Sequence, residues 1–311
     1  MAIQRHARPP RPAHAMRRGL ARRRPGRPPF CSTMPHVSAA ASRPEPARTV
    51  LVTGAARRLG REISLAFARA GWDVVAHYRH SADAAHALAA EIGALGRRCT
   101  LLAADLAQAD AAADLLGRAQ AATGVLPHCI VNNASLFEPD AAADASAAGL
   151  ARHLATNTVT PLLLANALAA AVAAAGDAGA SGRHSVVHVL DQKVHNLNPD
   201  YFSYTVSKLA LAGAVALQAQ ALAPRVRVCG LSPGLMYLSG PQTEDNFARA
   251  SRVNLLQRAI DPAQVARCAL FIAENDALNG TTLQADNGQH LVALDRDVMF
   301  AVDGAARGPA A

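Results

Sequence analysis

Residues 50–60 read VLVTGAARRLG, an apolar run that passes through a glycine-bearing turn into the start of a helix. The run before the turn is short and rich in β-branched residues, as in a buried strand. Gly54 permits a tight turn, and Gly60 permits close packing of the helix that follows. The amides at the start of that helix are free to face an anion. The stretch therefore predicts that an α/β domain begins here with a strand, a turn and a helix.

Predicted strands and helices alternate along the rest of the chain. The expected strands are 49–53, 73–77, 98–103, 128–131, 184–190, 226–231 and 281–285, and the expected helices are 59–70, 82–93, 108–122, 147–175, 203–222 and 262–273. Alternating strands and helices predict a parallel sheet covered on both faces. Right-handed crossovers and this strand count indicate a single α/β domain with a Rossmann-type doubly wound sheet over residues 49–295. Residues 296–311 are expected to be a C-terminal tail, and segment 234–260 a mobile flap.

Composition narrows the functions that this domain can have. Of the 311 residues, 51% are hydrophobic, and the formal net charge is +8. Residues 1–33 hold nine arginines and no acidic residue, so the rest of the chain carries a net charge of −1. A nearly neutral domain gives little support to nucleic-acid binding. Residues 1–48 are expected to be a disordered Arg/Pro-rich extension. Such a start can mimic an organelle transit peptide, but we favour translation from Met34.

The five cysteines show no CxxC spacing, and three of them lie in apolar, strand-like runs. They indicate buried reduced thiols of a cytoplasmic protein, so neither a metal site nor a disulfide is expected. No apolar run reaches the roughly 18 uninterrupted residues of a membrane span. We therefore expect no membrane partner.

The stretch Tyr204-Thr205-Val206-Ser207-Lys208 brings a tyrosine and a lysine to one helical face, four residues apart. Lys208 can place positive charge near the phenol of Tyr204, which would favour the phenolate and draw its pKa towards working pH. Alone, this spacing is more often solvated helix surface. Asn132-Asn133-Ala134 supplies a third stretch, directly after the apolar run 129–131.

In this order and spacing, the three stretches resemble the short-chain dehydrogenase/reductase family over about residues 49–291. The family usually has a glycine where Arg58 stands. The variant T-G-x-x-x-R-x-G and the later stretch His77-Tyr78-Arg79-His80-Ser81 resemble its pteridine reductase branch. The resemblance implies an NADPH-dependent oxidoreductase that acts on a small molecule. It also implies a homotetramer that packs through helices 147–175 and 203–222.

NADPH is expected rather than NADH because no acidic residue ends the second strand, where NAD-preferring relatives bind the ribose hydroxyls. Arg58 can reach an adenosine 2′-phosphate or the pyrophosphate, although it can also be a solvated first-turn residue. Asp105 matches the position that accepts a hydrogen bond from the adenine amino group, and it can also cap a helix. The implied cofactor-binding residues are Gly54, Arg58, Leu59, Gly60, Tyr78, Arg79, His80, Ser81, Asp105, Leu106, Asn133, Ala134, Ser135, Tyr204, Lys208, Pro233 and Gly234.

Asp191 stands where most of the family has the serine that holds a substrate carbonyl, a replacement that pteridine reductases share. An Asp–Tyr pair that relays a proton suits a pterin ring, which takes up a hydride and a proton on a ring nitrogen. Alternatively, Asp191 only caps the next turn. The resemblance implies that Asn157 orders a water near the lysine and that Lys208 binds the nicotinamide ribose. The implied catalytic residues are Asp191, Tyr204, Lys208 and Asn157. Lys193 has no corresponding role.

Ser135 and Phe137 match the pteridine reductase pattern, in which the aromatic ring stacks on the pterin opposite the nicotinamide. Phe137 could also be a core residue. The implied substrate-binding residues are Ser135, Phe137, Asp191, Tyr204 and Leu235. We therefore expect reduction of a dihydropterin such as dihydromonapterin, dihydrobiopterin or dihydrofolate. The alternatives are a 3-oxoacyl or other ketone reductase, and a non-catalytic NADP(H)-binding regulator.

Overall fold

The computed structural model describes residues 48–304, except for residue 109 and residues 177–183. The extension predicted over residues 1–48, with its proposed start at Met34, therefore lies outside the described residues but for Arg48. The described residues belong to one compact unit.

The centre of this unit is a parallel sheet of seven strands in the order β3-β2-β1-β4-β5-β6-β7. The strands are β1 (Thr49–Val52), β2 (Asp73–Tyr78), β3 (Cys99–Ala103), β4 (Cys129–Asn132), β5 (His184–Val189), β6 (Val226–Pro233) and β7 (Thr282–Ala285). The direction of winding reverses between β1 and β4, so a crevice opens at the carboxyl ends of these two strands. The predicted doubly wound, Rossmann-type α/β domain is confirmed.

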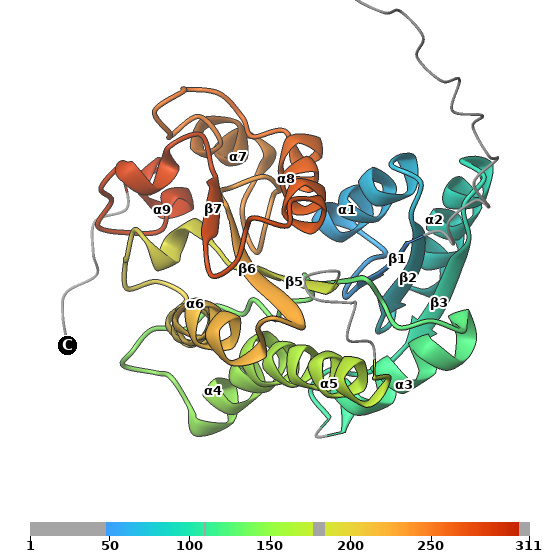
Figure 1. Ribbon diagram of the computed structural model, residues 1–311. Helices are drawn as coiled ribbons and strands as arrows, with labels where there is room; N and C mark the ends of the chain where they lie inside the picture. Colours follow the sequence, from blue (N-terminus) through green and yellow to red (C-terminus); the bar gives the residue numbers. More distant parts are fainter. Residues whose placement is uncertain (1–47, 109, 177–183, 305–311) are drawn as a thin grey trace, which may run out of the picture. The chain divides into compact units, whose positions relative to one another are not determined.

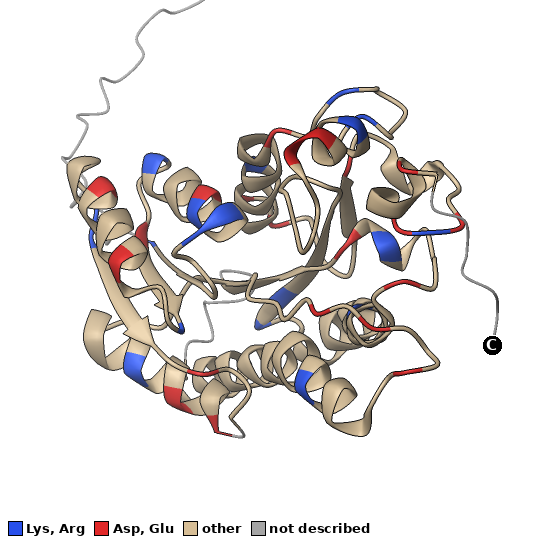
Figure 2. Cartoon of the chain, turned by 180° about the vertical axis from the view of Figure 1, so that it is seen from behind, with Lys and Arg blue, Asp and Glu red and all other residues tan. Residues whose placement is uncertain are grey.

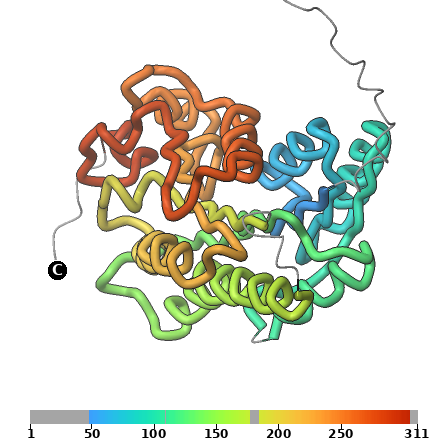
Figure 3. Tube along the Cα trace, viewed as in Figure 1, coloured from blue at the N-terminus to red at the C-terminus, as the bar shows by residue number. Residues whose placement is uncertain are grey.

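Helices cover both faces of the sheet, as Figures 1 and 3 show. The helices are α1 (Arg58–Arg69), α2 (Ala82–Ala94), α3 (Ala111–Thr123), α4 (Ala147–Leu154), α5 (Thr160–Ala174), α6 (Phe202–Leu222), α7 (Glu244–Ala250), α8 (Pro262–Glu274) and α9 (Val298–Ala301). Buried residues of α1, α2 and α8 share one hydrophobic cluster with one face of the sheet. Buried residues of α3, α5 and α6 share a second cluster with the other face.

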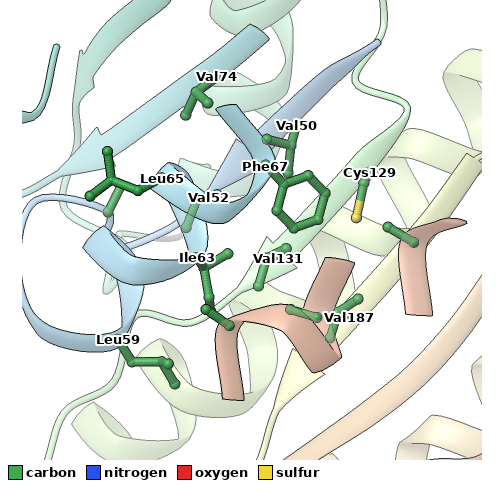
Figure 4. Packing of buried hydrophobic residues seen from close by; sticks show 14 of the residues in the cluster. Val50, Val52, Leu59, Ile63, Leu65, Phe67, Val74, Cys129, Val131 and Val187 are labelled. Atoms are coloured by element: carbon green, nitrogen blue, oxygen red, sulfur yellow. The ribbon is translucent and has the colours of Figure 1, made fainter. Parts of the chain in front are cut away.

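The alternation of side chains along β1 divides these two clusters. Val50 and Val52 pack in the first cluster, and Leu51 between them packs in the second. In Figure 4, Ile63 and Phe67 of α1 lie over the central strands. Phe67 is fully buried, and burial of such a side chain contributes about 1.5–3 kcal/mol. This packing fixes the start of α1 at the crevice.

The long helix predicted over residues 147–175 is interrupted by a π-helical turn, Ala155–Val159. Pro161 has no N–H to donate to the carbonyl of Asn157 four residues earlier. The wider turn accommodates this missing hydrogen bond, and such turns are frequent at functional sites. Residues 147–174 and α6 are long and apolar enough to cross a membrane by length and composition alone. Both pack on the domain, since α5 shares the second hydrophobic cluster and α6 contacts β6.

Residues 296 and 297, which follow the predicted domain boundary at residue 295, pack on the domain. Arg296 pairs with Asp200 at 2.9 Å, and Asp297 pairs with Lys193 at 3.0 Å. The segment 234–260, predicted as a flap, contains α7, and the buried Asn246 of α7 donates to the carbonyl of Met299. Part of that segment is therefore anchored to the C-terminal residues rather than free.

Charged residues of both signs are mixed along the described helices, as Figure 2 shows. This distribution agrees with the near-neutral charge calculated for the chain after residue 33.

Candidate active site

A cleft of about 490 Å³ opens at the carboxyl ends of the central strands, a volume that suits a small molecule. Most of the predicted site residues line it. They are Gly54, Arg58, Leu59, Gly60, Arg79, Asp105, Leu106, Asn133, Ala134, Ser135, Phe137, Asp191, Tyr204, Lys208, Pro233, Gly234 and Leu235. Tyr78, His80, Ser81 and Asn157 do not line the cleft. The cleft is also lined by residues that were not among the predicted site residues, namely Arg57, His77, Gln192, Lys193, Gln289, Asp297 and Val298.

The turn after β1 requires its two glycines for different reasons. Gly54 has a φ of +63°, a conformation that favours glycine. A Cβ on Gly60 would lie 2.1 Å from the carbonyl oxygen of Gly54, closer than any real contact. Arg58 also has a positive φ, +50°, at the position where the sequence analysis noted the family's usual glycine. A strained backbone at a large side chain is retained where that side chain has a function.

Polar side chains brace this turn from both sides. Asn133 donates from Nδ2 to the carbonyl oxygens of Thr53 (2.9 Å) and Gly54 (3.2 Å). On the other side, the Gly54 N–H donates to Nδ1 of His77 at 3.1 Å. Nε2 of His77 therefore carries the proton and donates to the carbonyl of Ala104, also at 3.1 Å. Burial lowers the pKa of His77, so the ring stays neutral. His77 thus ties the turn to the end of β3.

The two arginines predicted to bind the cofactor face opposite halves of the cleft. Arg58 donates from Nη2 to the carbonyl of Leu238 at 3.0 Å, in the loop after β6. Arg79 follows β2, with Nη1 3.9 Å from Oδ1 of Asp105 after β3. Because β6 and β3 lie on opposite sides of β1, the two guanidinium groups point apart. The resemblance places adenine at Asp105 and nicotinamide beside the loop after β6. Arg79 is therefore the better candidate for a 2′-phosphate.

The cleft fits a nicotinamide dinucleotide on its own geometry. The Gly54–Gly60 turn brings the N-terminus of α1 to the cleft, where backbone amides and the helix dipole favour a pyrophosphate. Arg79 supplies a cation at the β3 side. Lys208, which is 3% exposed, supplies another beneath the β5 end. The α1 amides, Arg79 and Lys208 thus offer positive charge and N–H donors to the phosphates and ribose hydroxyls of a dinucleotide.

Asp191 uses its two carboxylate oxygens for two separate contacts. Oδ2 accepts a hydrogen bond from the Tyr204 hydroxyl at 2.6 Å. Oδ1 accepts the Lys193 N–H at 2.8 Å and caps the short helical turn Gln192–Val194. The capping role and the tyrosine contact were alternatives in the sequence analysis, and the structure shows both contacts.

Lys208 does not lower the pKa of Tyr204 in this structure, contrary to the sequence prediction. Burial raises the pKa of Tyr204 well above 10, and the Asp191 carboxylate adds to this effect. The Lys208 ammonium donates to the Val189 carbonyl at 2.7 Å and lies 5.8 Å from the Tyr204 ring centroid. Burial also raises the pKa of Asp191, and it lowers the pKa of Lys208 to about 8. Tyr204 is therefore a neutral hydroxyl that donates to Asp191.

Asn157 lies in the π-helical turn and braces the loop that carries Ser135 and Phe137. Its Nδ2 donates to the carbonyl of Leu136 and to Oγ of Ser207, both at 2.9 Å. Its Oδ1 accepts the Leu136 N–H at 2.7 Å. The side chain therefore joins the loop after β4 to α6. Its predicted role beside Lys208 stays a prediction.

Phe137 lies in an aromatic cluster at the substrate end of the cleft. Its ring stacks on Tyr201, with centroids 4.1 Å apart, and meets the Tyr204 ring edge-on at 4.6 Å. Met299 of α9 completes the buried part of this cluster. Phe137 thus combines the core and cleft positions that the sequence left open. Neither Tyr201 nor Met299 could be found from a local motif, because they meet only through packing.

Comparisons with known proteins agree with this geometry. The family profile described as short chain dehydrogenase matches residues 48–246. The crystal structure of FolM alternative dihydrofolate reductase 1 from Brucella canis, complexed with NADP, has a TM-score of 0.70 and 34% identity, covering 78% of this chain and 94% of that one. Pteridine reductase 1 of Leishmania tarentolae is 30% identical over 282 residues, covering 79% of this chain and 97% of the relative. Dihydromonapterin reductase of Citrobacter koseri is 25% identical over 242 residues, covering 78% and 96%.

Proposed function

This chain belongs to the short-chain dehydrogenase family and is an oxidoreductase of the pteridine reductase-like branch, as its sequence predicted, and we propose that it reduces a dihydropterin with NADPH. The observation that carries the proposal is the 2.6 Å hydrogen bond from Tyr204 to the buried carboxylate of Asp191. A carboxylate at this place can take up and return a proton, which a serine hydroxyl held for a ketone does not need to do.

NADPH as the reductant is supported by the residues that end β2. No acidic residue is present from Tyr78 to Ser81, and Arg79 lines the cleft there. A guanidinium group can pair with a 2′-phosphate through charged hydrogen bonds. The Brucella canis structure carries NADP, which agrees with this choice. NADPH, when bound, supplies the hydride.

The side chains around the cleft supply the proton. When Asp191 is protonated, its carboxyl donates to the Tyr204 oxygen, and the Tyr204 hydroxyl is then free to donate its own proton to the ring nitrogen of the substrate. Because burial raises the pKa of Asp191, its carboxyl holds a proton more readily than an exposed one and can restore the proton that Tyr204 has lost. Lys208, held by the Val189 carbonyl, places a cation beneath the tyrosine and offers its remaining donors to a ribose. Phe137 offers a flat apolar wall for a heteroaromatic ring and keeps water from Tyr204.

The rival functions make less use of these contacts. A 3-oxoacyl or other ketone reductase would use a hydroxyl at position 191 rather than a carboxylate. A non-catalytic NADP(H)-binding regulator would need neither the Asp191–Tyr204 bond nor a nearby lysine. Dihydropterin reduction accounts for Asp191, Tyr204 and Lys208 together.

A substrate panel with the purified full chain tests the proposal. NADPH oxidation is followed by absorbance with dihydromonapterin, dihydrobiopterin and dihydrofolate, and in parallel with a 3-oxoacyl thioester and a simple ketone. We expect the dihydropterins to be reduced with the higher kcat/KM. Preferred turnover of the thioester would show the ketone reductase instead, and binding of NADPH without turnover of any substrate would show the regulator.

We also propose that the protein is a cytoplasmic homotetramer. The four cysteines of the described residues are all free thiols. α5 and α6 expose apolar side chains, among them Leu163 and Leu217, which are 42% and 67% exposed. Light scattering of the purified protein would give the mass of the assembly, and a monomer would contradict the proposal.

A further inference from the structure

Lys193 is one of only two lysines in the chain, and its side chain, which is 3% exposed, lines the cleft. The ammonium donates from Nζ to Oδ1 of Asn198 at 2.5 Å and to Oδ2 of Asp297 at 3.0 Å. Asp200 also lies near the ammonium, but it pairs with Arg296 at 2.9 Å. A buried ion pair is weak evidence for a stabilising role, since an apolar pair of similar volume is often at least as stable. Both residues of the Lys193–Asp297 pair line the cleft, which indicates a role there.

The backbone of Lys193 contacts the proton relay directly. Its N–H donates to Oδ1 of Asp191 at 2.8 Å, and Oδ2 of the same carboxylate accepts the Tyr204 hydroxyl at 2.6 Å. Lys193 is thus joined to the relay through its main chain and to Asp297 through its side chain. Because both links belong to one residue, a displacement of the ammonium can displace the N–H that holds the Asp191 carboxyl.

Asp297 links the ammonium to the other side of the same tyrosine. Its Oδ2 accepts from Lys193, and its Oδ1 accepts the Met299 N–H at 3.2 Å, so that Asp297 caps α9. Met299 packs in the same buried cluster as Tyr204. A closed chain of contacts therefore runs from Asp191 through Lys193, Asp297 and Met299 to Tyr204, and the Tyr204 hydroxyl returns it to Asp191.

The two charges of the pair also act on the relay. Burial raises the pKa of Asp191, and the ammonium groups of Lys193 and of Lys208 on α6 oppose this effect. Burial raises the pKa of Tyr204, and the carboxylates of Asp191 and Asp297 add to this effect. The charged groups that face the relay are thus the two lysines and Asp297.

We propose that Lys193 is a positioning residue, which holds the Asp191 carboxyl against Tyr204 through its ion pair with Asp297. This inference rests on the proposed function, because the relay that Lys193 serves is the one proposed for dihydropterin reduction. Lys193 acts through Asp191 and transfers no proton itself. Asp297 lies beyond residue 246, where the match to the family profile ends, so the contact belongs to the C-terminal part of this chain.

The test measures kcat, KM and the pH profile of kcat with dihydromonapterin. Lys193→Met keeps the length of the side chain and removes its charge. We expect this variant to lower kcat by about tenfold or more with little change in KM, since a small misplacement of catalytic groups can cost about 100-fold. The limb of the profile set by Asp191 should move to higher pH by about one unit, because a cation that favours the carboxylate is lost. Lys193→Arg keeps the cation and should keep the limb at its wild-type position.

A double variant covers the case in which Lys193→Met does not fold because Asp297 is left unpaired. Lys193→Met combined with Asp297→Asn leaves neither charge buried alone, and it should still show the lower kcat and the moved limb. Arg97→Met is the matched control, because Arg97 pairs with the buried Asp73 at 2.6 Å, at the end of β2 away from the cleft. This control should lose stability in urea and keep the wild-type limb.

The outcomes separate this role from the proposed function. Lower stability with an unmoved limb and wild-type kcat, in both Lys193→Met and the double variant, would overturn the positioning role and leave the proposed function standing. A wild type that reduces ketones and no dihydropterin would overturn the proposed function. The same pH profiles, measured with the ketone, would then still decide whether Lys193 positions Asp191.

Discussion

Replacing Asp191 by asparagine separates the two contacts of its carboxylate. Asparagine keeps the size of the side chain and one oxygen, which can still cap the Lys193 N–H. The amide nitrogen that replaces Oδ2 cannot accept the Tyr204 O–H. Asp191→Asn therefore preserves the local turn and removes both the proton acceptor and the titrating group.

The expected loss of activity follows from that contact. A hydrogen bond to a charged group contributes about 1.5–3 kcal/mol. At about 1.4 kcal/mol for each tenfold change in rate, loss of the contact alone lowers kcat for a dihydropterin by about 10- to 150-fold. If Asp191 also restores the proton of Tyr204, the loss extends towards the 10²–10⁴-fold that general acid–base catalysis supplies. The pH profile of pterin turnover should then lose or shift a limb.

The same substitution should also change how the free energy of unfolding depends on pH. Burial raises the pKa of Asp191 in the folded protein. The protonated Asp191 carboxyl contributes its full stability at pH values below its pKa in the unfolded chain. This contribution is lost as the pH rises through the higher pKa that Asp191 has in the folded protein. Asparagine has no such loss. The stability of Asp191→Asn relative to the wild type should therefore rise with pH over this window, as urea unfolding at several pH values would measure.

Asp73→Asn is the matched control. Asp73 is also buried, but it begins β2, at the end of the strand away from the cleft, and pairs with Arg97 and Arg98. We expect this variant to lose stability and to keep the turnover of each folded molecule. Wild-type turnover in Asp191→Asn, together with lower stability, would refute the proton relay and leave Asp191 as a cap.

Other variants test the remaining parts of the site. Tyr204→Phe should lower turnover by about 10²–10⁴-fold, because the substitution removes the proton donor. The dissociation constant for NADPH should change little, because the side-chain volume is almost unchanged. Near-normal turnover would remove Tyr204 from the mechanism. Arg79→Ala should weaken NADPH binding by about 1.5–3 kcal/mol and leave NADH binding unchanged. The Arg58 side chain faces the loop after β6, so Arg58→Ala should weaken the binding of both nucleotides equally. Fluorescence titration with each nucleotide distinguishes these results. Gly60→Ala should abolish binding of both nucleotides, since its Cβ would collide with the Gly54 carbonyl, and retained affinity would show that the turn can move.

The sequence by itself determined the features that depend on neighbouring residues. Gly54 and Gly60 indicate the turn by local constraints, because Gly54 has a φ of +63° and a Cβ on Gly60 would collide with the Gly54 carbonyl oxygen. The four-residue spacing of Tyr204 and Lys208 places them on one helical face wherever the helix lies. The parallel, doubly wound character of the sheet followed in turn from the alternation of strands and helices and from the handedness of the crossovers.

Tertiary structure decided which distant groups meet and what each contact does. Arg58 could have reached either half of a dinucleotide, and the position of the loop after β6 turned it towards Leu238. Lys193 had no role in the sequence, because its partner Asp297 lies 104 residues later. The sequence also gave the wrong direction for the pKa of Tyr204. A pKa depends on burial and on charges from every packed element. The four-residue spacing could not show that the Asp191 carboxylate accepts the Tyr204 hydroxyl at 2.6 Å, while the Lys208 ammonium lies 5.8 Å from the Tyr204 ring centroid.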